Sequence, residues 1–132
     1  MIRYIVLGKY SQDFLSGLIY NPQDRKKAAA AMMKKTGTKW AEGESYLHIN
    51  HPNYDFVGIV YSKDENTMKA SADMMRATGS FTDINFFRAW VPEEYTQISK
   101  KASELVRVIP REYSLDISLE APKYILMVMY PT

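Results

Sequence analysis

Apolar residues along the first segment of the chain leave no polar face. Ile2–Tyr10 has the length of a strand, and successive side chains of a strand point to opposite faces of its sheet. One face would carry Ile2, Tyr4 and Val6, and the other Ile5 and Leu7. Strands with two apolar faces are typical of sheets that are covered on both sides. The segment therefore predicts a strand with no obvious water-facing side.

Two helices are predicted after this strand. Ser11–Tyr20 carries an apolar stripe and predicts a short helix. Asn21 and Pro22 predict the start of a second helix, because Asn is a good N-cap and Pro suits the first helical position. Gly37 predicts the end of that helix, because Gly readily adopts the left-handed conformation of a C-cap.

The next segments predict two more strands and a turn between them. Thr38–Asn50 is expected to be one long, irregular strand with a bend at Gly43. His51–Asn53 (His-Pro-Asn) predicts a turn, since Pro cannot donate to a strand ladder and Asn tolerates turn geometry. Tyr54–Tyr61 is again apolar on both faces and predicts a strand.

The second half of the chain continues with one helix, one strand and another helix. Ser62 and Glu65 match a capping box, which predicts a helix that begins after Ser62 and ends near Gly79. A strand is expected over Thr82–Val91 and a helix over Pro92–Arg107. Beyond Pro110, alternating and apolar runs predict two further strands, over residues 113–119 and 123–130.

The order of these elements predicts the fold class. With the C-terminal additions set aside, the order is β-α-β-β-α-β, that of a ferredoxin-like α+β sandwich. The helices of such a unit cover one face of the sheet, so a second apolar face needs another cover. We expect a second copy of the chain to supply it, which gives a homodimer whose sheets close into a dimeric α/β barrel. The alternative is that the C-terminal tail folds back over the open face.

Composition narrows the classes of function. The chain has 132 residues, which suits one domain, and it has no Cys, which excludes disulfides, thiolate metal sites and a cysteine nucleophile. A net charge of +2 gives no argument for nucleic acid or an anionic membrane as a partner. No stretch approaches the roughly 20 apolar residues of a membrane-spanning helix, and the N-terminal residues do not resemble a signal peptide. We therefore expect a cytoplasmic protein.

Three motifs resemble the GYD-domain family. Tyr4–Tyr10 (YIVLGKY) is similar to its opening strand. Asn53–Val57 (NYDFV) stands where the family carries its Gly-Tyr-Asp signature, with Asn in place of Gly. Phe81–Trp90, followed by VPEEY, is similar to its closing strand and Pro-Glu-Glu segment. The resemblance covers about residues 1–97 and implies a dimeric α/β barrel.

The resemblance leaves the C-terminal region and the activity open. Residues 98–132 have no counterpart in the family pattern, and we expect them to form an extension that packs on the same domain or on a partner subunit. The family is largely of unknown function. Its wider superfamily includes proteins similar to antibiotic-biosynthesis monooxygenases, muconolactone isomerases, chlorite dismutases and haem-binding peroxidases, and fold analogy across that range says little about function.

Three side chains are the candidates for catalysis. His48 and His51 could serve as general acid or base, or ligate a metal or haem. Residues i and i+3 of a regular strand point to opposite faces, so no metal site is predicted, and both could equally be surface side chains beside a turn. Arg88 lies on an apolar strand face, which suggests a cavity for an anion or carbonyl, or an ion pair between subunits. Alternatively, its guanidinium reaches solvent at the strand edge.

A pocket for a flat apolar ligand is predicted from aromatic residues and the signature acid. Its residues are Trp40, Tyr46, Tyr54, Asp55, Phe86 and Trp90. The alternatives are that the aromatic residues form ordinary core and that Asp55 caps the preceding turn. Several helical methionines are expected to pack helices first and to fill pocket gaps second; they are Met32, Met33, Met68, Met74 and Met75.

These observations favour a homodimer that binds a small apolar or aromatic molecule. If it is an enzyme, cofactor-independent oxygenation or isomerisation would suit His48 or His51 acting with Arg88; the sequence names neither a reaction nor a cofactor. One alternative is a non-catalytic assembly module in which residues 110–132 exchange strands between subunits, forming higher homo-oligomers. A further alternative is a haem-binding protein. Phosphate-binding loops and the serine-hydrolase elbow are missing from the sequence.

Overall fold

A computed structural model describes residues 1–109. The two strands expected after Pro110 lie outside the described residues. The chain divides into two compact units, Met1–Ala89 and Trp90–Thr132, and each is described by itself.

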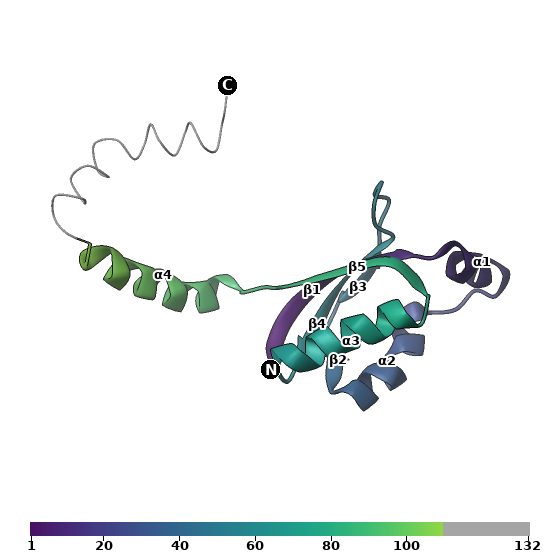
Figure 1. Cartoon of the computed structure of the whole chain (residues 1–132), viewed down its shortest axis with the longest axis horizontal. Coiled ribbons are helices and arrows are strands. Elements are labelled where there is room, and N and C mark those ends of the chain that lie inside the picture. Colours follow the sequence, from purple (N-terminus) through teal and green to yellow (C-terminus); the bar gives the residue numbers. More distant parts are fainter. Residues whose placement is uncertain (110–132) are drawn as a thin grey trace, which may run out of the picture. The chain divides into compact units, whose positions relative to one another are not determined.

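The first unit contains one antiparallel sheet (Figure 1). Its strands are β1 (Ile2–Tyr10), β2 (Thr38–Trp40), β3 (Tyr46–His48), β4 (Phe56–Ser62) and β5 (Phe81–Arg88). The strand order is β2-β4-β1-β5, and β3 also pairs with β4. Because β2 and β3 pair with different parts of the same strand, they share one edge position, and the sheet is four strands wide.

Helices cover one side of this sheet. The first unit contains α1 (Gln12–Tyr20), α2 (Arg25–Thr36) and α3 (Glu65–Ala77). The helix α2 packs along β2, and α3 packs against β5 and β4. Figure 1 shows α2 and α3 on the same side of the sheet. The protein therefore has an α+β fold, as the sequence predicted. No helix within residues 1–109 is long and apolar enough to cross a membrane.

Two of the helix starts expected from the sequence are wrong. The N-cap of α2 is Asp24, whose carboxylate accepts a hydrogen bond from the backbone N–H of Lys27 (3.2 Å), so Pro22 lies outside the helix. The N-cap of α3 is Asp64, which accepts from the N–H of Thr67 (2.7 Å). Ser62 is still part of β4, and its fully buried hydroxyl donates to the Asp64 carbonyl. In both cases an aspartate closer to the helix supplies the capping oxygen.

The long strand expected over Thr38–Asn50 is also wrong. The chain forms two short strands, β2 and β3, separated by a bend in which Gly43 has a φ of 81°. Few L residues adopt this left-handed conformation, so the bend stays close to Gly43 as expected. Two other expected helix boundaries are confirmed. Ser11 is the N-cap of α1, and Gly37 is the C-cap of α2, with a φ of 82°.

The face of the sheet beneath α2 and α3, here called the helix face, holds the core. Its buried cluster consists of Tyr4, Val6, Tyr10, Phe56, Val60, Met68, Phe81 and Ile84. The packing is close enough that a Cβ on Gly8 would lie 2.2 Å from the ring of Phe56. Only glycine therefore fits beneath this ring. The core depends on the absence of a side chain at that point of β1.

The opposite side of the sheet, here called the open face, is also apolar. Its central residues on β1 and β4 pair directly across the strands, Ile5 with Ile59 and Leu7 with Val57. These four side chains are half-buried, whereas Phe87 on β5 is exposed. The alternation along the strands thus gives two apolar faces, as predicted.

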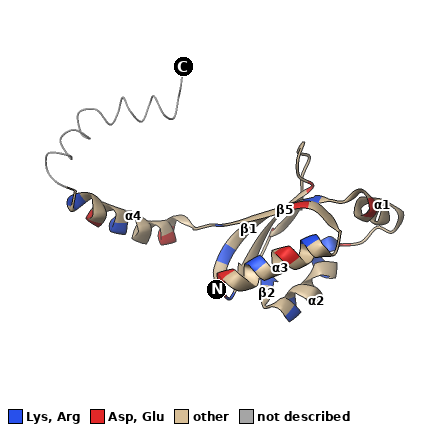
Figure 2. Ribbon diagram, in the orientation of Figure 1, with Lys and Arg blue, Asp and Glu red and all other residues tan. Residues whose placement is uncertain are grey.

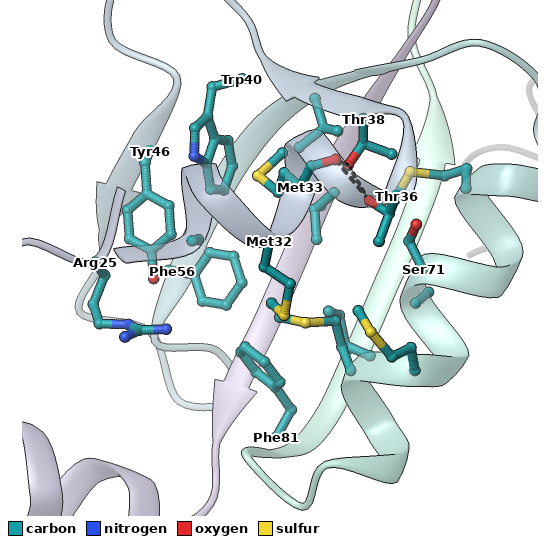
Figure 3. A pocket seen from close by; sticks show the side chains of 18 residues that line it. Arg25, Met32, Met33, Thr36, Thr38, Trp40, Tyr46, Phe56, Ser71 and Phe81 are labelled. Carbon is teal, nitrogen blue, oxygen red and sulfur yellow. Dashed lines mark hydrogen bonds between the residues drawn. The ribbon is translucent and has the colours of Figure 1, made fainter. Parts of the chain in front are cut away.

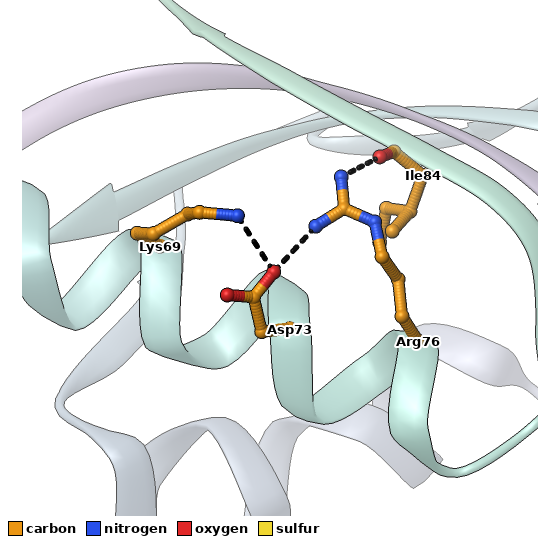
Figure 4. A network of polar contacts seen from close by, with 4 residues as sticks. All are labelled: Lys69, Asp73, Arg76 and Ile84. Atoms are coloured by element: carbon orange, nitrogen blue, oxygen red, sulfur yellow. Dashed lines mark hydrogen bonds and ion pairs between the residues drawn. The ribbon is translucent and has the colours of Figure 1, made fainter.

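Polar contacts fix α3 to the sheet (Figure 4). Arg76 donates to the backbone carbonyl of Ile84 on β5 and to the carboxylate of Asp73 (2.7 Å), which also accepts from Lys69 (2.8 Å). These hydrogen bonds, led by that from Lys69, lower the pKa of Asp73. Figure 2 shows that positive and negative side chains alternate along α3, which is the pattern of a solvated helix surface.

The described part of the second unit is the helix α4 (Pro92–Arg107). The backbone N–H of Val91 donates to the carboxylate of Glu94 (2.9 Å), and Pro92 occupies the start of the helix. Both features are typical of a helix N-terminus. The helix expected over these residues is confirmed.

Candidate functional site

A cavity of about 70 Å³ lies between the helix face and the helices α2 and α3 (Figure 3). Its walls are mainly apolar, and five methionines line it: Met32, Met33, Met68, Met74 and Met75. Met side chains are unbranched and flexible, so they adapt to the shape of what they contact. We call this space the methionine cavity.

One wall of the methionine cavity is aromatic. The rings of Tyr46 and Phe56 stack with their centroids 4.9 Å apart, and Trp40 meets Tyr46 edge-on at 5.1 Å. The indole N–H of Trp40 donates to the carbonyl of Lys26 (3.1 Å), which ties this wall to α2. A Cβ on Gly58 would lie 2.9 Å from the Trp40 ring, so the indole rests on bare backbone. These contacts hold the wall in place.

Polar groups gather at the end of the cavity where Arg25 lies. The hydroxyls of Tyr10 and Tyr46 share a hydrogen bond. Burial raises the pKa of both tyrosines, and for Tyr46 the hydrogen bond with Tyr10 raises it further. Figure 3 shows the Tyr46 hydroxyl directed toward the Arg25 guanidinium. That guanidinium lies 4.6 Å from the centre of the Phe14 ring, a cation–π contact.

The two histidines are placed differently. His48 is exposed but lies on the helix face, with its ring centroid 5.2 Å from that of Tyr46 and 6.2 Å from that of Tyr10. His51 is exposed in the turn that follows, and its Nδ1 accepts from the backbone N–H of Asn53 (3.0 Å). The structure thus brings His48 to the rim of the polar end and places His51 elsewhere. No group of three or more metal-ligating side chains occurs within residues 1–109.

Arg88 does not line the methionine cavity. Arg88 ends β5, is exposed, and pairs across the strands with Tyr4. Burial raises the pKa of Tyr4, and the nearby charge of Arg88 acts in the opposite direction. Trp90 begins the second unit and is 45% exposed. Arg88, the candidate for catalysis, therefore lies apart from the methionine cavity within the first unit.

Tyr54, Asp55 and Phe86 also lie outside the methionine cavity. The carboxylate of Asp55 accepts from the backbone N–H of Tyr10 (2.8 Å), and its own N–H donates to the carbonyl of Gly8 (2.8 Å). The Tyr54 hydroxyl accepts from the side chain of Asn85 (2.8 Å). These contacts join the start of β4 to β1 and β5. Phe86 packs edge-on against Tyr4.

Sequence reasoning missed part of the cavity. Trp40 and Tyr46 were expected in a pocket, and the methionines were expected to pack helices first and fill pocket gaps second, whereas Arg25 and Phe56 were not expected there. Three residues before Arg25 were already expected to be helical, so the pattern gave no signal that Arg25 is the first residue of α2.

Comparison with known protein families identifies a match over most of the chain. The family model described as the GYD domain matches residues 4–99. A search of curated proteins found no match to the chain. The matched region contains β1 from Tyr4 onward, the other strands of the sheet and all the residues that line the methionine cavity. The chain therefore belongs to the GYD domain family.

Proposed function

We propose that this GYD domain protein binds a small apolar or aromatic molecule in the methionine cavity. The observation that carries the proposal is the cavity itself, because an apolar space with flexible walls and a few polar groups at one end is the usual form of a ligand site. Its volume of about 70 Å³ is small, so the ligand would have a short body and would displace methionine side chains on entry.

Calorimetric titration with a small neutral probe, benzyl alcohol, tests ligand binding. Ser71→Leu adds a side chain at the α3 wall of the cavity, and we expect it to weaken binding at least about tenfold, which is about 1.4 kcal/mol. The matched control is Ala70→Leu, the same side chain at an exposed position of the same helix. Wild-type protein that does not bind, or equal binding in both variants, would argue against the cavity as the site.

We also propose that the sheet is that of a ferredoxin-like unit. When β2 and β3 are taken as one edge strand and α1 and α2 as one crossover, the order of the first unit becomes β-α-β-β-α-β. The helices that pack on the sheet, α2 and α3, lie on one side of it, which supports the same assignment (Figure 1).

The open face supports a homodimer in which two sheets pack together as a dimeric α/β barrel. Ile5, Leu7, Val57 and Ile59 form a continuous apolar centre beside the exposed Phe87. An apolar sheet face of this kind is stabilised by burial against a matching face, and a second copy provides one by symmetry.

Light scattering tests the dimer. We expect wild-type protein to have twice the mass of the chain and Phe87→Lys to have the mass of a single chain. The lysine charge would be costly to bury between two sheets, and because Phe87 is exposed in the single chain, its replacement should leave the core intact. Ala70→Lys, on α3, is the control and should leave the mass unchanged. A monomeric wild-type protein would contradict the proposed assembly.

A further inference from the structure

One end of the methionine cavity carries a guanidinium nitrogen without an acceptor. Arg25 Nε is buried, and no acceptor for its proton exists among residues 1–109. Within the same residues, Arg25 forms no ion pair with Asp or Glu. Buried polar groups are nearly always hydrogen-bonded, so a buried N–H without an acceptor suggests a missing partner.

The two tyrosine hydroxyls beside Arg25 supply a second unused proton. Tyr10 and Tyr46 share one hydrogen bond, in which one O–H donates to the other oxygen. Each hydroxyl has its own proton, so one of the two is left to donate outside the pair. A phenol keeps its proton at neutral pH because its ordinary pKa is about 10, and burial raises the pKa of both tyrosines further.

The nearby carboxylate does not fill this role. Asp55 exerts a charge effect on Tyr10, but its Oδ2 accepts from the backbone N–H of Tyr10 (2.8 Å). The free donors therefore lack an anionic partner within the described part of the chain. The guanidinium carbon of Arg25 lies 4.6 Å from the centre of the Phe14 ring, and the guanidinium also hydrogen-bonds the Tyr46 side chain, so Arg25 and the two tyrosines form one polar group.

We propose that the methionine cavity binds small organic acids, with the carboxylate held by Arg25 and the Tyr10–Tyr46 hydroxyls and the apolar body among the methionines. This inference rests on the proposed function of the same cavity and names the class of its ligand. A guanidinium suits a carboxylate because its N–H groups match the two oxygens in geometry and charge. The volume of about 70 Å³ restricts the body to a single ring or a short chain.

Matched pairs of probes separate the charge from the apolar body. We would titrate benzoate against benzyl alcohol, and hexanoate against 1-hexanol, at one pH and ionic strength. The wild type is expected to bind each acid at least about tenfold more tightly than its alcohol, because a charge-assisted hydrogen bond is stronger than a neutral one. In Arg25→Met this preference should fall to within about twofold, while the affinity for the alcohols stays the same.

Lys27→Met is the matched control, because it removes one positive charge from an exposed position on the same helix turn. It should keep the preference for acids. A second variant, Tyr46→Phe, should weaken acid binding and spare the alcohols, whereas Tyr20→Phe, at an exposed position, should change neither. Arg25→Lys keeps the charge and should retain part of the preference.

The outcomes distinguish this inference from the function on which it rests. Equal binding of acids and alcohols by the wild type would overturn the acid site and leave an apolar ligand site. A preference that survives Arg25→Met, or that Lys27→Met also abolishes, would overturn the role of Arg25. If neither acids nor alcohols bind, the proposed function fails, and the inference fails with it.

Discussion

Phe56 on the helix face is 3% exposed, whereas Phe87 on the open face is 47% exposed. Both lie in apolar surroundings on the same sheet, yet only Phe56 is covered by the helices of its own unit. The helix face is closed around a small cavity, and the open face presents a continuous apolar centre. Apolar composition alone therefore does not say what a sheet face does. The element that covers it decides between core, ligand site and interface.

The largest expected change in stability comes from replacing these two phenylalanines in turn. Phe56→Ala removes a stacked ring from the centre of the core and should lower the free energy of unfolding by about 3–5 kcal/mol at any protein concentration. Phe87→Ala should cost less, and its cost should grow with protein concentration if the open face is an interface. Urea unfolding at two protein concentrations measures both. A concentration-dependent loss for Phe56→Ala alone would reverse the assignment of the faces.

A pair of glycines tests how tightly the helix face is packed. Gly8→Ala places a Cβ against the Phe56 ring and should destabilise the protein by about 1–3 kcal/mol. Gly17→Ala is the control: it lies within α1 with nothing near the added Cβ, and it should stabilise the protein by about 0.5–1 kcal/mol. Thermal unfolding compares the two. Equal effects would mean that the ring does not rest on Gly8.

The smallest expected effect is the pH dependence of stability that comes from the N-cap of α3. The hydrogen bond from the Thr67 backbone lowers the pKa of Asp64 below its ordinary value of 3.8. Because the pKa is lower in the folded than in the unfolded chain, this cap stabilises the fold above about pH 4 and the contribution is lost as the pH falls through the folded-state pKa. Asp64→Asn keeps a capping oxygen that does not titrate.

Urea unfolding at neutral pH and at about pH 3 measures this contribution. The wild type should lose more stability on acidification than Asp64→Asn does, because only the wild type has a carboxylate to protonate at the cap. An equal loss in the two proteins would show that Asp64 does not carry the pH dependence of α3.

The alternation of side chains predicted much of the sheet but less of its connections. The segment Ile2–Tyr10 forms a strand as expected, since a short run rich in β-branched and aromatic residues with two apolar faces is typical of a strand in a covered sheet. The cap at Ser62 was wrong because Ser62 continues β4, where it is buried, and Asp64 lies closer to the helix. Such choices depend on the end of the strand, which the local pattern does not define.

The candidate site was predicted only in part for a similar reason. Trp40 and Tyr46 were expected in a pocket because both are aromatic residues of expected strands, and they do line the cavity. Arg25 and Tyr10 meet Tyr46 only after β1, α2 and β3 come together, so no spacing along the chain reveals their contact. His48 reaches this group through its place on β3, whereas Arg88 lies at the end of β5 and does not.

The most direct test of the account asks whether a ligand enters the methionine cavity. The protein has eight methionines, and carbon-13 labelling of their methyl groups gives each a separate nuclear magnetic resonance signal. On titration with benzyl alcohol, we expect the signals of the five cavity methionines, Met32, Met33, Met68, Met74 and Met75, to shift together, while that of Met1, which is 67% exposed, stays in place. Cavity signals that do not move at a saturating concentration, or a shift of Met1 alone, would contradict the account.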